Sequence, residues 1–393
     1  MIPVAEALAR VLALGTPLPA ERVPLRAAAG RVLAAPVIAS RDQPPFDASA
    51  MDGYAIRDAD HRSGVQLTVI GEAGAGHAFS GAVGAGEAVR IFTGAPVPDG
   101  ADRVVIQEDV TRDGDRITLG ERLETQSNIR DLGNDFKVGD RLPAPRRLRP
   151  ADLGLIAAMN VPEVTVTRRP AVAILSTGDE LVMPGGSPRP DQIIASNAIA
   201  LAAMAEGAGA EVRVLPIARD TPDSLRFAFG LAADADVLVT IGGASVGDHD
   251  LVGRMATELG FEQAFWKIAM RPGKPLMAGR LGRSIMLGLP GNPVSAFVCA
   301  QLFLLPLLDQ LQGIERRSST EMARVLDPLP ANGPRAHYMR ASLGFADGQP
   351  TIAPMGSQDS SLMTVLGSAD ALLVRPVGDR ARAAGEMVEF IRI

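Results

Sequence analysis

The hydrophobic and polar positions of this chain follow different periods in different regions. Between residues 170 and about 312, short apolar runs alternate with longer segments whose apolar residues recur on one helical face. The run Val237–Ile241 is apolar and β-branched, which is typical of a strand buried on both faces. Further strands are expected at 171–178, 211–217, 265–270 and 284–290, and helices at 193–209 and 221–233. This alternation predicts a doubly wound α/β domain.

The remaining regions have other patterns. Short strands separated by turns occupy 64–120 and 317–393, which predicts a small all-β unit and a C-terminal β sandwich or barrel. One amphipathic helix opens the chain, and another follows Pro150, where proline and an early aspartate mark a helix start. Because these two helices are alike in amphipathicity, we expect them to pack together, with the β unit inserted between them.

The predicted fold class is therefore a multidomain α/β plus β protein. Its parts are a helical and mixed N-terminal linker domain (1–40 and 137–169), an inserted β-rich domain (41–136), the doubly wound α/β domain (170–316) and a C-terminal β-barrel-like domain (317–393). A chain of 393 residues can bury these cores without disulfide bonds.

Composition excludes several classes of protein. The net charge of −6, the 4% aromatic content and the lack of a long basic run argue against nucleic-acid binding. The N-terminus carries Glu6 and no basic segment, unlike a signal peptide, and no apolar stretch is expected to reach the length of a membrane span. We therefore expect a cytoplasmic protein. The single cysteine, Cys299, lies in an apolar run and is predicted to be a small buried hydrophobe.

Glycines and carboxylates follow the central predicted strand. The segment GGASVGDHD places Gly242 and Gly243 directly after Val237–Ile241, and Asp248 and Asp250 a few residues later. In open α/β sheets, ligands bind beyond the carboxyl ends of the strands. Glycines there allow backbone N–H groups to approach an anion, and carboxylates can hold a hard cation such as Mg²⁺. Taken alone, the segment fits a tight turn and a solvated acidic loop equally well.

Cationic and helix-starting residues follow other predicted strands. Arg271 and Lys274 share the Pro-Gly turn MRPGKP, where arginine can hold an oxyanion through two hydrogen bonds. LPGNP places Asn292 and Pro293 at the first positions of a helix, whose free N–H groups favour an anion. Glu180 in STGDE adds a carboxylate, although it could be a first-turn helix charge. Together these loops indicate a phosphorylated or nucleotide substrate with a divalent cation.

Several other sites are disfavoured. The histidines lack the spacing of a zinc site, and neither a dinucleotide-binding nor a P-loop motif is present. On their own, Asp220 fits a loop-terminal charge and Thr93 a turn cap.

The motifs as a set resemble those of a known family. PPFDASAMDGYA, FTGAPVP, NIRDLGND, STGDEL, GGASVGDHD, FWKIAMRPGKP, LPGNPVSA and GSQDSS occur in this order from about residue 44 to 361. The chain thereby resembles the molybdopterin molybdotransferase family, the molybdenum insertases that include gephyrin-like E domains. The resemblance implies an elongated homodimer with its active cleft between subunits, and an α/β domain that binds molybdopterin. It implies that adenylylated molybdopterin and molybdate react with Mg²⁺ to give molybdenum cofactor and AMP.

The resemblance also implies roles for individual residues. Catalytic roles fall to Asp52, Thr93, Glu180, Asp220, Asp250, Lys267 and Lys274. Substrate and phosphate binding is expected at Gly242, Gly243, Ser245, Pro290, Gly291, Asn292 and Asp135. Molybdate, a tetrahedral dianion, is expected to be held by Arg271, Lys274, Arg340 and Ser360. Mg²⁺ ligands are expected among Glu180, Asp248 and Asp250. A molybdopterin adenylyltransferase and molybdoenzyme chaperones are further expected partners.

This chain departs from the family pattern near its C-terminus. Arg271 stands where the family commonly has lysine, which keeps the charge and changes the geometry. Ser357, Asp359 and Ser361 replace the His, Gly and second His of the usual G-H-x-G-S-H pattern, whereas Ser360 is retained.

Two other functions compete with molybdenum insertion. An adenylyltransferase acting one step earlier uses a similar α/β domain, but the fused MDGYA unit and C-terminal β domain favour insertion. A non-enzymatic scaffold is disfavoured by the retained site residues. Asp52 and Thr93 lie at turns with no partner evident in their own β unit. The resemblance implies that this unit faces the α/β domain of a second chain.

Overall fold

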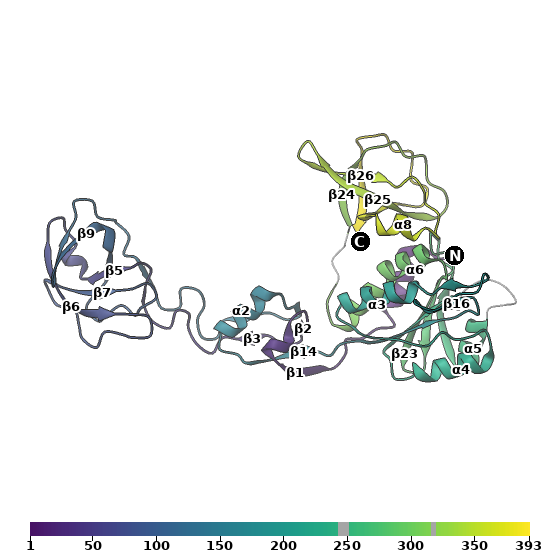
Figure 1. Cartoon of the computed structure of the whole chain (residues 1–393), viewed down its shortest axis with the longest axis horizontal. Coiled ribbons are helices and arrows are strands. Elements are labelled where there is room, and N and C mark those ends of the chain that lie inside the picture. Colours follow the sequence, from purple (N-terminus) through teal and green to yellow (C-terminus); the bar gives the residue numbers. More distant parts are fainter. Residues whose placement is uncertain (243–250, 316–319) are drawn as a thin grey trace.

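The chain folds into an elongated molecule with several separate bodies (Figure 1). The computed structural model describes residues 1–242, 251–315 and 320–393. In Figure 1 a β-rich body lies at one end, a small mixed unit lies in the middle, and the α/β domain lies with the C-terminal strands at the other end.

The α/β domain is built on a six-stranded sheet of order β18-β15-β19-β23-β22-β20. β18 (Glu211–Val214), β15 (Ala171–Ser176), β19 (Val237–Ile241) and β23 (Ser284–Leu289) are parallel. β22 (Met277–Leu281) and β20 (Phe261–Trp266) complete the sheet as an antiparallel pair. Every residue of β19 is buried, as its unbroken apolar run predicts.

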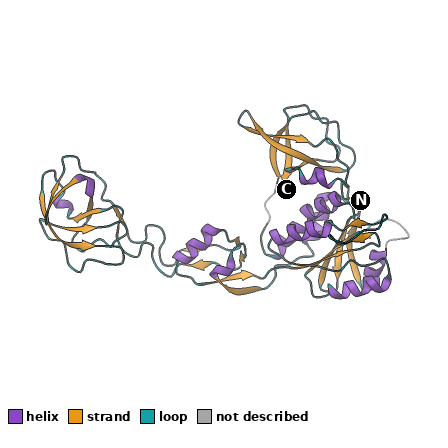
Figure 2. Cartoon of the chain, viewed as in Figure 1, coloured by secondary structure: helices purple, strands orange, loops and turns teal. Residues whose placement is uncertain are grey.

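Helices cover both faces of this sheet (Figure 2). β15 shows the reason, because Val172 and Ile174 pack in one hydrophobic cluster while Ala173 and Leu175 pack in another. The first cluster includes α3 (Asn197–Gly207), α6 (Pro293–Cys299) and α7 (Leu305–Leu311). The second includes α4 (Pro222–Leu231) and α5 (Leu251–Glu258). The predicted doubly wound domain is confirmed.

Several element predictions in this domain are wrong in extent. The strand expected at 211–217 ends at Val214, and the helix expected at 193–209 begins at Asn197, after the short strand β17 (Ile193–Ile194). The expected strand 265–270 is divided, because β20 ends at Trp266 and Lys267 has a positive φ of 68°. The chain then leaves the sheet, and β21 (Met270–Arg271) pairs with a strand of the C-terminal domain instead. β22 was not expected at all, since Gly279 and Arg280 interrupt its apolar pattern.

A continuous helix from Pro293 to Leu311 passes through the domain core. It comprises α6, a π-helical turn at Ala300–Leu304 and α7. By length and composition this helix could cross a membrane, so the expectation that no segment reaches that length is wrong. However, 67% of its apolar window is buried inside the protein, as in the core helix of a globular domain.

The N-terminal helix α1 (Val4–Leu12) belongs to this core as well. Its buried residues Ala7 and Val11 lie in the same cluster as α7, and it also contacts β20. α2 (Pro150–Ala158) instead packs in a separate cluster of the middle unit. The expected pairing of α1 with α2 is therefore wrong, because amphipathicity shows that a helix has a partner without showing which one.

The middle unit and the distal β body are joined by two thin ribbons. The middle unit has a sheet of order β1-β14-β2-β13 (Ala20–Pro24, Glu163–Thr167, Val32–Leu33, Arg146–Arg147). The ribbons pair β3 (Val37–Ile38) with β12 (Arg141–Leu142), and β4 (Ala48–Ser49) with β11 (Ile129–Arg130).

The distal β body is a six-stranded sheet of order β8-β5-β7-β6-β10-β9. Its strands are Arg103–Ile106, Gly53–Ile56, Glu87–Ile91, Gln66–Ala73, Arg116–Leu119 and Val110–Asp113. Hydrophobic clusters lie on both of its faces.

The C-terminal strands close into a barrel. β25 (Ala336–Ala346), β26 (Gln349–Pro354), β24 (Thr320–Val325), β28 (Met387–Arg392) and β27 (Ala371–Arg375) are neighbours in that order, and β27 pairs back to β25. A short helix, α8 (Met363–Gly367), lies between β26 and β27. β21 pairs in parallel with the start of β25, which places Arg271 opposite His337. The predicted barrel-like fold is confirmed.

Candidate active site

The carboxyl ends of three parallel strands meet at one edge of the α/β sheet. The N–H of Gly242, after β19, donates to the carbonyl of Leu289 in β23 at 3.1 Å, and Thr177 N–H donates to Ile241 at 3.1 Å. Gly242 has φ 90°, and a Cβ atom there would lie 2.9 Å from the carbonyl oxygen of Thr177. A glycine is therefore required at this point. Gly243, Ser245, Asp248 and Asp250 lie outside the described residues.

Carboxylates gather beyond β15 and β18. The N–H of Asp220 donates to a carboxylate oxygen of Asp179 at 3.4 Å. Burial and the charges of Asp179 and Glu180 raise the pKa of Asp220. Glu180 is exposed. Asp179, Glu180 and Asp220 therefore lie close enough at this edge for their charges to interact.

Whether these residues could bind a cation depends on the type and the arrangement of their ligand atoms. Oxygen ligands are those that Mg²⁺ prefers, and burial together with the neighbouring charges of Asp179 and Glu180 raises the pKa of Asp220. The donor set fits Mg²⁺ in chemistry. Within residues 1–242, 251–315 and 320–393, however, no group of three His, Cys, Asp or Glu residues is arranged to hold a metal.

A pocket of about 450 Å³ lies between the α/β domain and the barrel. We call it the anion pocket. Its lining comes from the turn after β21, from α6, from the start of β25 and from the loop after β26: Arg271, Pro272, Gly273, Lys274, Pro275, Ser295, Arg335, His337, Gln358, Asp359 and Ser360. Of the four molybdate donors expected from sequence, Arg271, Lys274 and Ser360 meet here, whereas Arg340 does not line the pocket.

The turn that carries Arg271 and Lys274 is tightly packed against α6. Gly273 has φ 107°, and a Cβ atom there would lie 2.5 Å from Sγ of Cys299. Cys299 is fully buried, as predicted, and burial raises the pKa of its thiol. Arg271 reaches Asn332 Oδ1 at 3.3 Å. The exposed Lys274 side chain makes no hydrogen bond or ion pair within the described part of the chain, so its ammonium is available to a ligand.

Arg335 and His337 are among the pocket residues that were not expected from the sequence. The half-buried Arg335 guanidinium has no hydrogen-bond or ion-pair partner among the described residues. His337 is buried, and its burial, with the nearby charges of Arg271 and Arg375, lowers its pKa to about 4. It is therefore neutral at pH 7. Arg335 and His337 are two residues apart where β25 begins, so an extended chain places them on the same face. The sequence did not show that this segment pairs with β21, which brings them to the turn that carries Arg271.

The start of α6 is occupied by the loop after β26. Asn292 is the N-cap and Pro293 the first helical residue, as predicted. The Asn292 side chain does not cap the helix but donates to Oγ of Ser360 at 2.9 Å. The N–H of Val294 donates to the carbonyl of Ser360 at 3.1 Å. That N–H group is consequently not available to a phosphate.

Arg340 lies behind the pocket wall. It is 1% exposed, and its Nη1 donates to the carbonyl of Asp359 at 2.8 Å. Asp359 in turn accepts hydrogen bonds from the N–H and hydroxyl of Ser361, which lower its pKa. Arg340 therefore holds the loop backbone. Among the described residues it is not part of a surface ion pair, and its guanidinium is not open to an anion in the pocket.

The distal β body contains a second set of candidates. Oδ1 of Asp52 accepts hydrogen bonds from both the hydroxyl and the N–H of Thr93, each at 2.7 Å. These bonds lower the pKa of Asp52. The expectation that neither residue has a partner in its own unit is wrong, because the ends of β5 and β7 bring them together. Asp135 lines a different pocket of about 330 Å³ with Phe46 and Arg130.

Lys267 lies at the strand end beside the anion-pocket turn. Its backbone has φ 68°, a conformation that non-glycine residues rarely adopt. Its Nζ lies 4.0 Å from the ring centroid of Trp266. The side chain is thus held over an aromatic ring by a cation–π contact.

The fold and these sites define a multidomain protein that joins an α/β ligand-binding domain to a cation-rich pocket. Family profiles match in the same order: the MoeA N-terminal region (domain I and II) over residues 2–160, a probable molybdopterin binding domain over 173–310, and the MoeA C-terminal region (domain IV) over 322–393. The chain belongs to the MoeA family of molybdopterin molybdenumtransferases. The family prediction made from the motifs is confirmed.

Individual relatives agree with this assignment. The molybdopterin molybdenumtransferase of Nostoc sp. is 37% identical over 386 residues, covering 95% of this chain and 88% of that protein. The enzyme of Haemophilus influenzae with the same name is 40% identical over 300 residues, 76% of this chain and 74% of that one. A crystal structure of the MoeA protein of Pyrococcus horikoshii has a TM-score of 0.83 at 31% identity, covering 100% of this chain and 99% of that chain.

Proposed function

We propose that this protein transfers molybdenum from molybdate to adenylylated molybdopterin, with release of AMP. The observation that carries the proposal is the anion pocket, where Lys274 and Arg335 have no partner within the described residues. A solvated pair of cations is ordinary on a surface, but cations directed into a pocket between two domains favour a bound anion.

Molybdate is proposed to bind in this pocket. A tetrahedral dianion leaving water needs several charge-assisted donors, and Arg271, Lys274 and Arg335 supply them from two sides. Ser295 and Ser360 add hydroxyl groups. Arg335 takes the place of Arg340 in the direct donor set, because the Arg340 guanidinium is buried and bonded to the loop. The volume of about 450 Å³ leaves room for part of an organic substrate beside the anion.

The adenylylated substrate is proposed to lie along the neighbouring strand ends. Gly242 and Gly291 allow close approach of a pyrophosphate there. Mg²⁺ would be held by Glu180 with Asp248 and Asp250, and it would supply charge neutralisation on the pyrophosphate. Asp220 and Lys267 are proposed to position the phosphate groups, and Lys274 borders both subsites.

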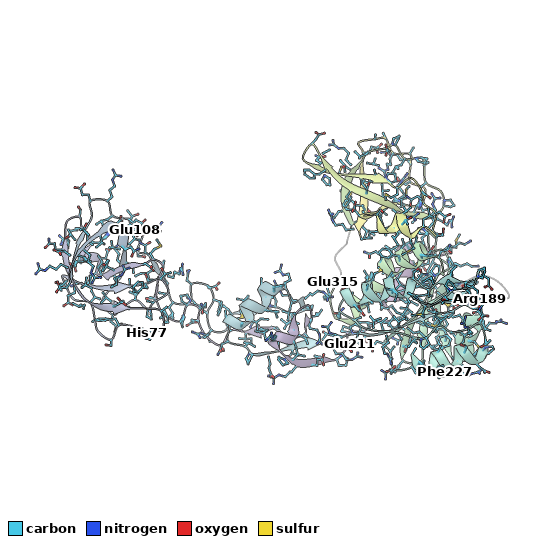
Figure 3. The ribbon with its side chains drawn as sticks, viewed as in Figure 1. His77, Glu108, Arg189, Glu211, Phe227 and Glu315 are labelled. Atoms are coloured by element: carbon cyan, nitrogen blue, oxygen red, sulfur yellow. The ribbon has the colours of Figure 1, made fainter. Side chains whose placement is uncertain are left out.

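We propose that the active form is a homodimer. Asp52, Thr93 and Asp135 belong to the β body and its connection, at the far end of the chain from the anion pocket. Figure 3 shows this separation through Glu108 in the β body and Arg189 beside the α/β sheet. These residues would complete the site from a second copy. Exposed apolar side chains near β17 (Ile193–Ile194), namely Ile193 (59% exposed) and Ile199 (53%), suit such a contact.

The cellular setting follows the same proposal. A cofactor-building enzyme of this kind is expected in the cytoplasm. Its expected partners are the molybdopterin adenylyltransferase that makes its substrate and the chaperones that receive its product.

Reconstitution tests the function. Purified protein would receive adenylylated molybdopterin, molybdate and Mg²⁺, with cofactor and AMP as readouts. Arg335→Ala and Lys274→Ala should each weaken molybdate use by about tenfold or more, because one charge-assisted hydrogen bond contributes roughly 1.5–3 kcal/mol. Arg324→Ala is the matched control, since Arg324 lies on the same barrel and bonds Gln349 away from the pocket.

The outcomes separate the alternatives. An unchanged molybdate dependence in both pocket variants would remove molybdate from this pocket. AMP release that persists without Mg²⁺, or in Glu180→Ala, would remove the proposed cation role. Formation of adenylylated molybdopterin from ATP would identify the earlier reaction instead. Full activity of a monomer in light scattering would refute the shared active site.

A further inference from the structure

We propose that Arg340 and Gln358 are positioning residues that hold Ser360 at the junction between barrel and α/β domain. In this arrangement Arg340 acts on molybdate through the loop and not by contact. The inference rests on the proposed function, because it concerns the anion pocket, and it names residues to which that function gives no direct role.

Gln358 is bonded to β25 at both ends of its amide. Its Oε1 accepts the backbone N–H of Arg340 at 3.0 Å, and its Nε2 donates to the carbonyl of Arg340 at 3.0 Å. Nε2 also donates to the carbonyl of Met355 at 3.0 Å. The side chain therefore imitates a neighbouring strand at the point where β26 has ended. A side chain of other length or polarity could not make all three bonds.

The Arg340 side chain fixes the next residue of the same loop. Nη1 donates to the Asp359 carbonyl at 2.8 Å, and Nη2 lies 3.4 Å from Oε1 of Gln358. Arg340 is among the largest fully buried side chains of the protein, and burial lowers its pKa. A buried guanidinium is costly unless its donors are used, so these bonds define one loop conformation strongly.

Ser360 follows directly and bonds to the other domain. Its hydroxyl accepts from Asn292, and its carbonyl accepts from the N–H of Val294 at the start of α6. A continuous chain of hydrogen bonds thus runs from β25 through the loop to the α/β domain. The barrel and this helix also share one hydrophobic cluster, which includes Tyr338 and Leu372 of the barrel. The hydrophobic cluster joins the barrel to the α/β domain, whereas the chain of hydrogen bonds fixes the position of Ser360 in the pocket wall.

The consequence for function is geometric. The pocket walls come from separate segments, so an anion is held well only if Ser360 and the turn at 271–275 keep their separation. Small displacements of binding groups have large effects on reactions that depend on orientation. Removing the hydrogen bonds that Arg340 and Gln358 make to this loop should therefore weaken molybdate binding and leave the other substrate-binding residues in place.

A double-mutant cycle on the full-length protein tests this inference. Gln358→Leu removes the amide bonds and leaves the buried cation on the Asp359 carbonyl, so this variant should fold. It would be compared with Ser360→Ala, with the double variant, and with Arg340→Met. Ser342→Ala is the control, because Ser342 lies on the same strand and makes only a 3.5 Å contact to Ala353. The readouts are KM for molybdate, kcat at saturating molybdate, and thermal unfolding.

We expect Gln358→Leu and Ser360→Ala each to raise KM for molybdate about tenfold, with kcat close to wild type. KM for molybdate in the double variant should be no more than about twofold above that of the more impaired single variant, because both changes release the same group. Arg340→Met should behave like Gln358→Leu wherever it folds.

Three results would overturn the inference. The first is an unchanged KM in Gln358→Leu. The second is a KM increase in the double variant that equals the product of the Gln358→Leu and Ser360→Ala increases, which would show that the two residues act independently. The third is a lower unfolding temperature with no change in KM, which would leave only a structural role. Failure of the proposed function has a different signature, because Lys274→Ala and Arg335→Ala would then also leave molybdate dependence unchanged.

Discussion

His337 should make the barrel sensitive to acid. Its imidazole is buried in the anion pocket, and it faces Arg271 from β21, Arg335 just before β25, Arg340 from β25, and Arg375 from β27. Burial and these guanidinium groups lower the pKa of His337 from 6.5 to about 4. The opposing carboxylates are Asp359 at the pocket and Asp379, which is already paired with Arg375. We predict that His337→Gln reduces the acid sensitivity of the barrel.

The sign and size follow from proton linkage. Between pH 6.5 and about 4 the unfolded chain protonates this histidine and the folded chain does not, so the free energy of unfolding falls as the pH falls. The difference amounts to about 2 kcal/mol at about pH 5 and about 3 kcal/mol below about pH 4, and it vanishes above about pH 7. His337→Gln has no such group and should lack this loss.

Two measurements check the prediction. The chain has four histidines, so NMR resonances can be assigned by single substitutions, and that of His337 should titrate near pH 4. Hydrogen exchange of β25 and β27 amides at about pH 7.5 and about pH 5 reports the free energy of opening the barrel. Added molybdate should raise the pKa of His337, because a dianion offsets the surrounding positive charge.

The comparison can refute the reasoning directly. A His337 resonance that titrates near 6.5 would mean that neither burial nor the guanidinium groups lower its pKa. Equal loss of barrel stability in wild type and His337→Gln between the two pH values would mean that another group controls acid sensitivity. A pKa of His337 unchanged by molybdate would place the anion elsewhere.

Three further predictions concern other parts of the chain. Gly273→Ala should cost about 1–3 kcal/mol in unfolding measurements and weaken molybdate use, because its Cβ would meet Cys299 and its φ is 107°; normal stability would contradict the tight turn. Thr93→Val should raise the pKa of Asp52 toward 3.8, as followed by carboxyl NMR, since it removes the hydroxyl donor; no shift would show that the hydroxyl bond is not formed. Asp152→Asn should destabilise the middle unit by about 1–2 kcal/mol near pH 7, and wild type should lose this advantage as the pH falls below 3.8 toward about 2; equal urea midpoints of the two proteins near pH 7 would contradict it.

The sequence determined the elements whose signals are local. The buried run of β19, the proline at the start of α2 and the N-cap position of Asn292 are each decided by neighbouring residues, and each was predicted. The glycine turns after strands also predicted that Arg271, Lys274 and Gly242 lie at one edge, because the carboxyl ends of parallel strands face the same side of the sheet. The ordered motifs carried the family, which the profile matches confirmed.

Tertiary structure decided which side chains meet. Arg340 was expected at the anion, but closure of β27 onto β25 encloses it and leaves Arg335 and His337 on the pocket side. Asp52 and Thr93 became partners because the ends of two strands converge across 41 positions of sequence. Packing of α1 against α7 could not be read from its amphipathic pattern.

The physical reason is common to these cases. A hydrophobic period fixes which face of an element is buried, since burial depends on the residue itself. The partner of a buried or charged group depends on register, closure and through-space approach, and a shift of one residue along a strand reverses every side chain on it. Local physics therefore fixed the elements and the chemistry available at their ends, while only the assembled barrel and sheet fixed which donors share the pocket.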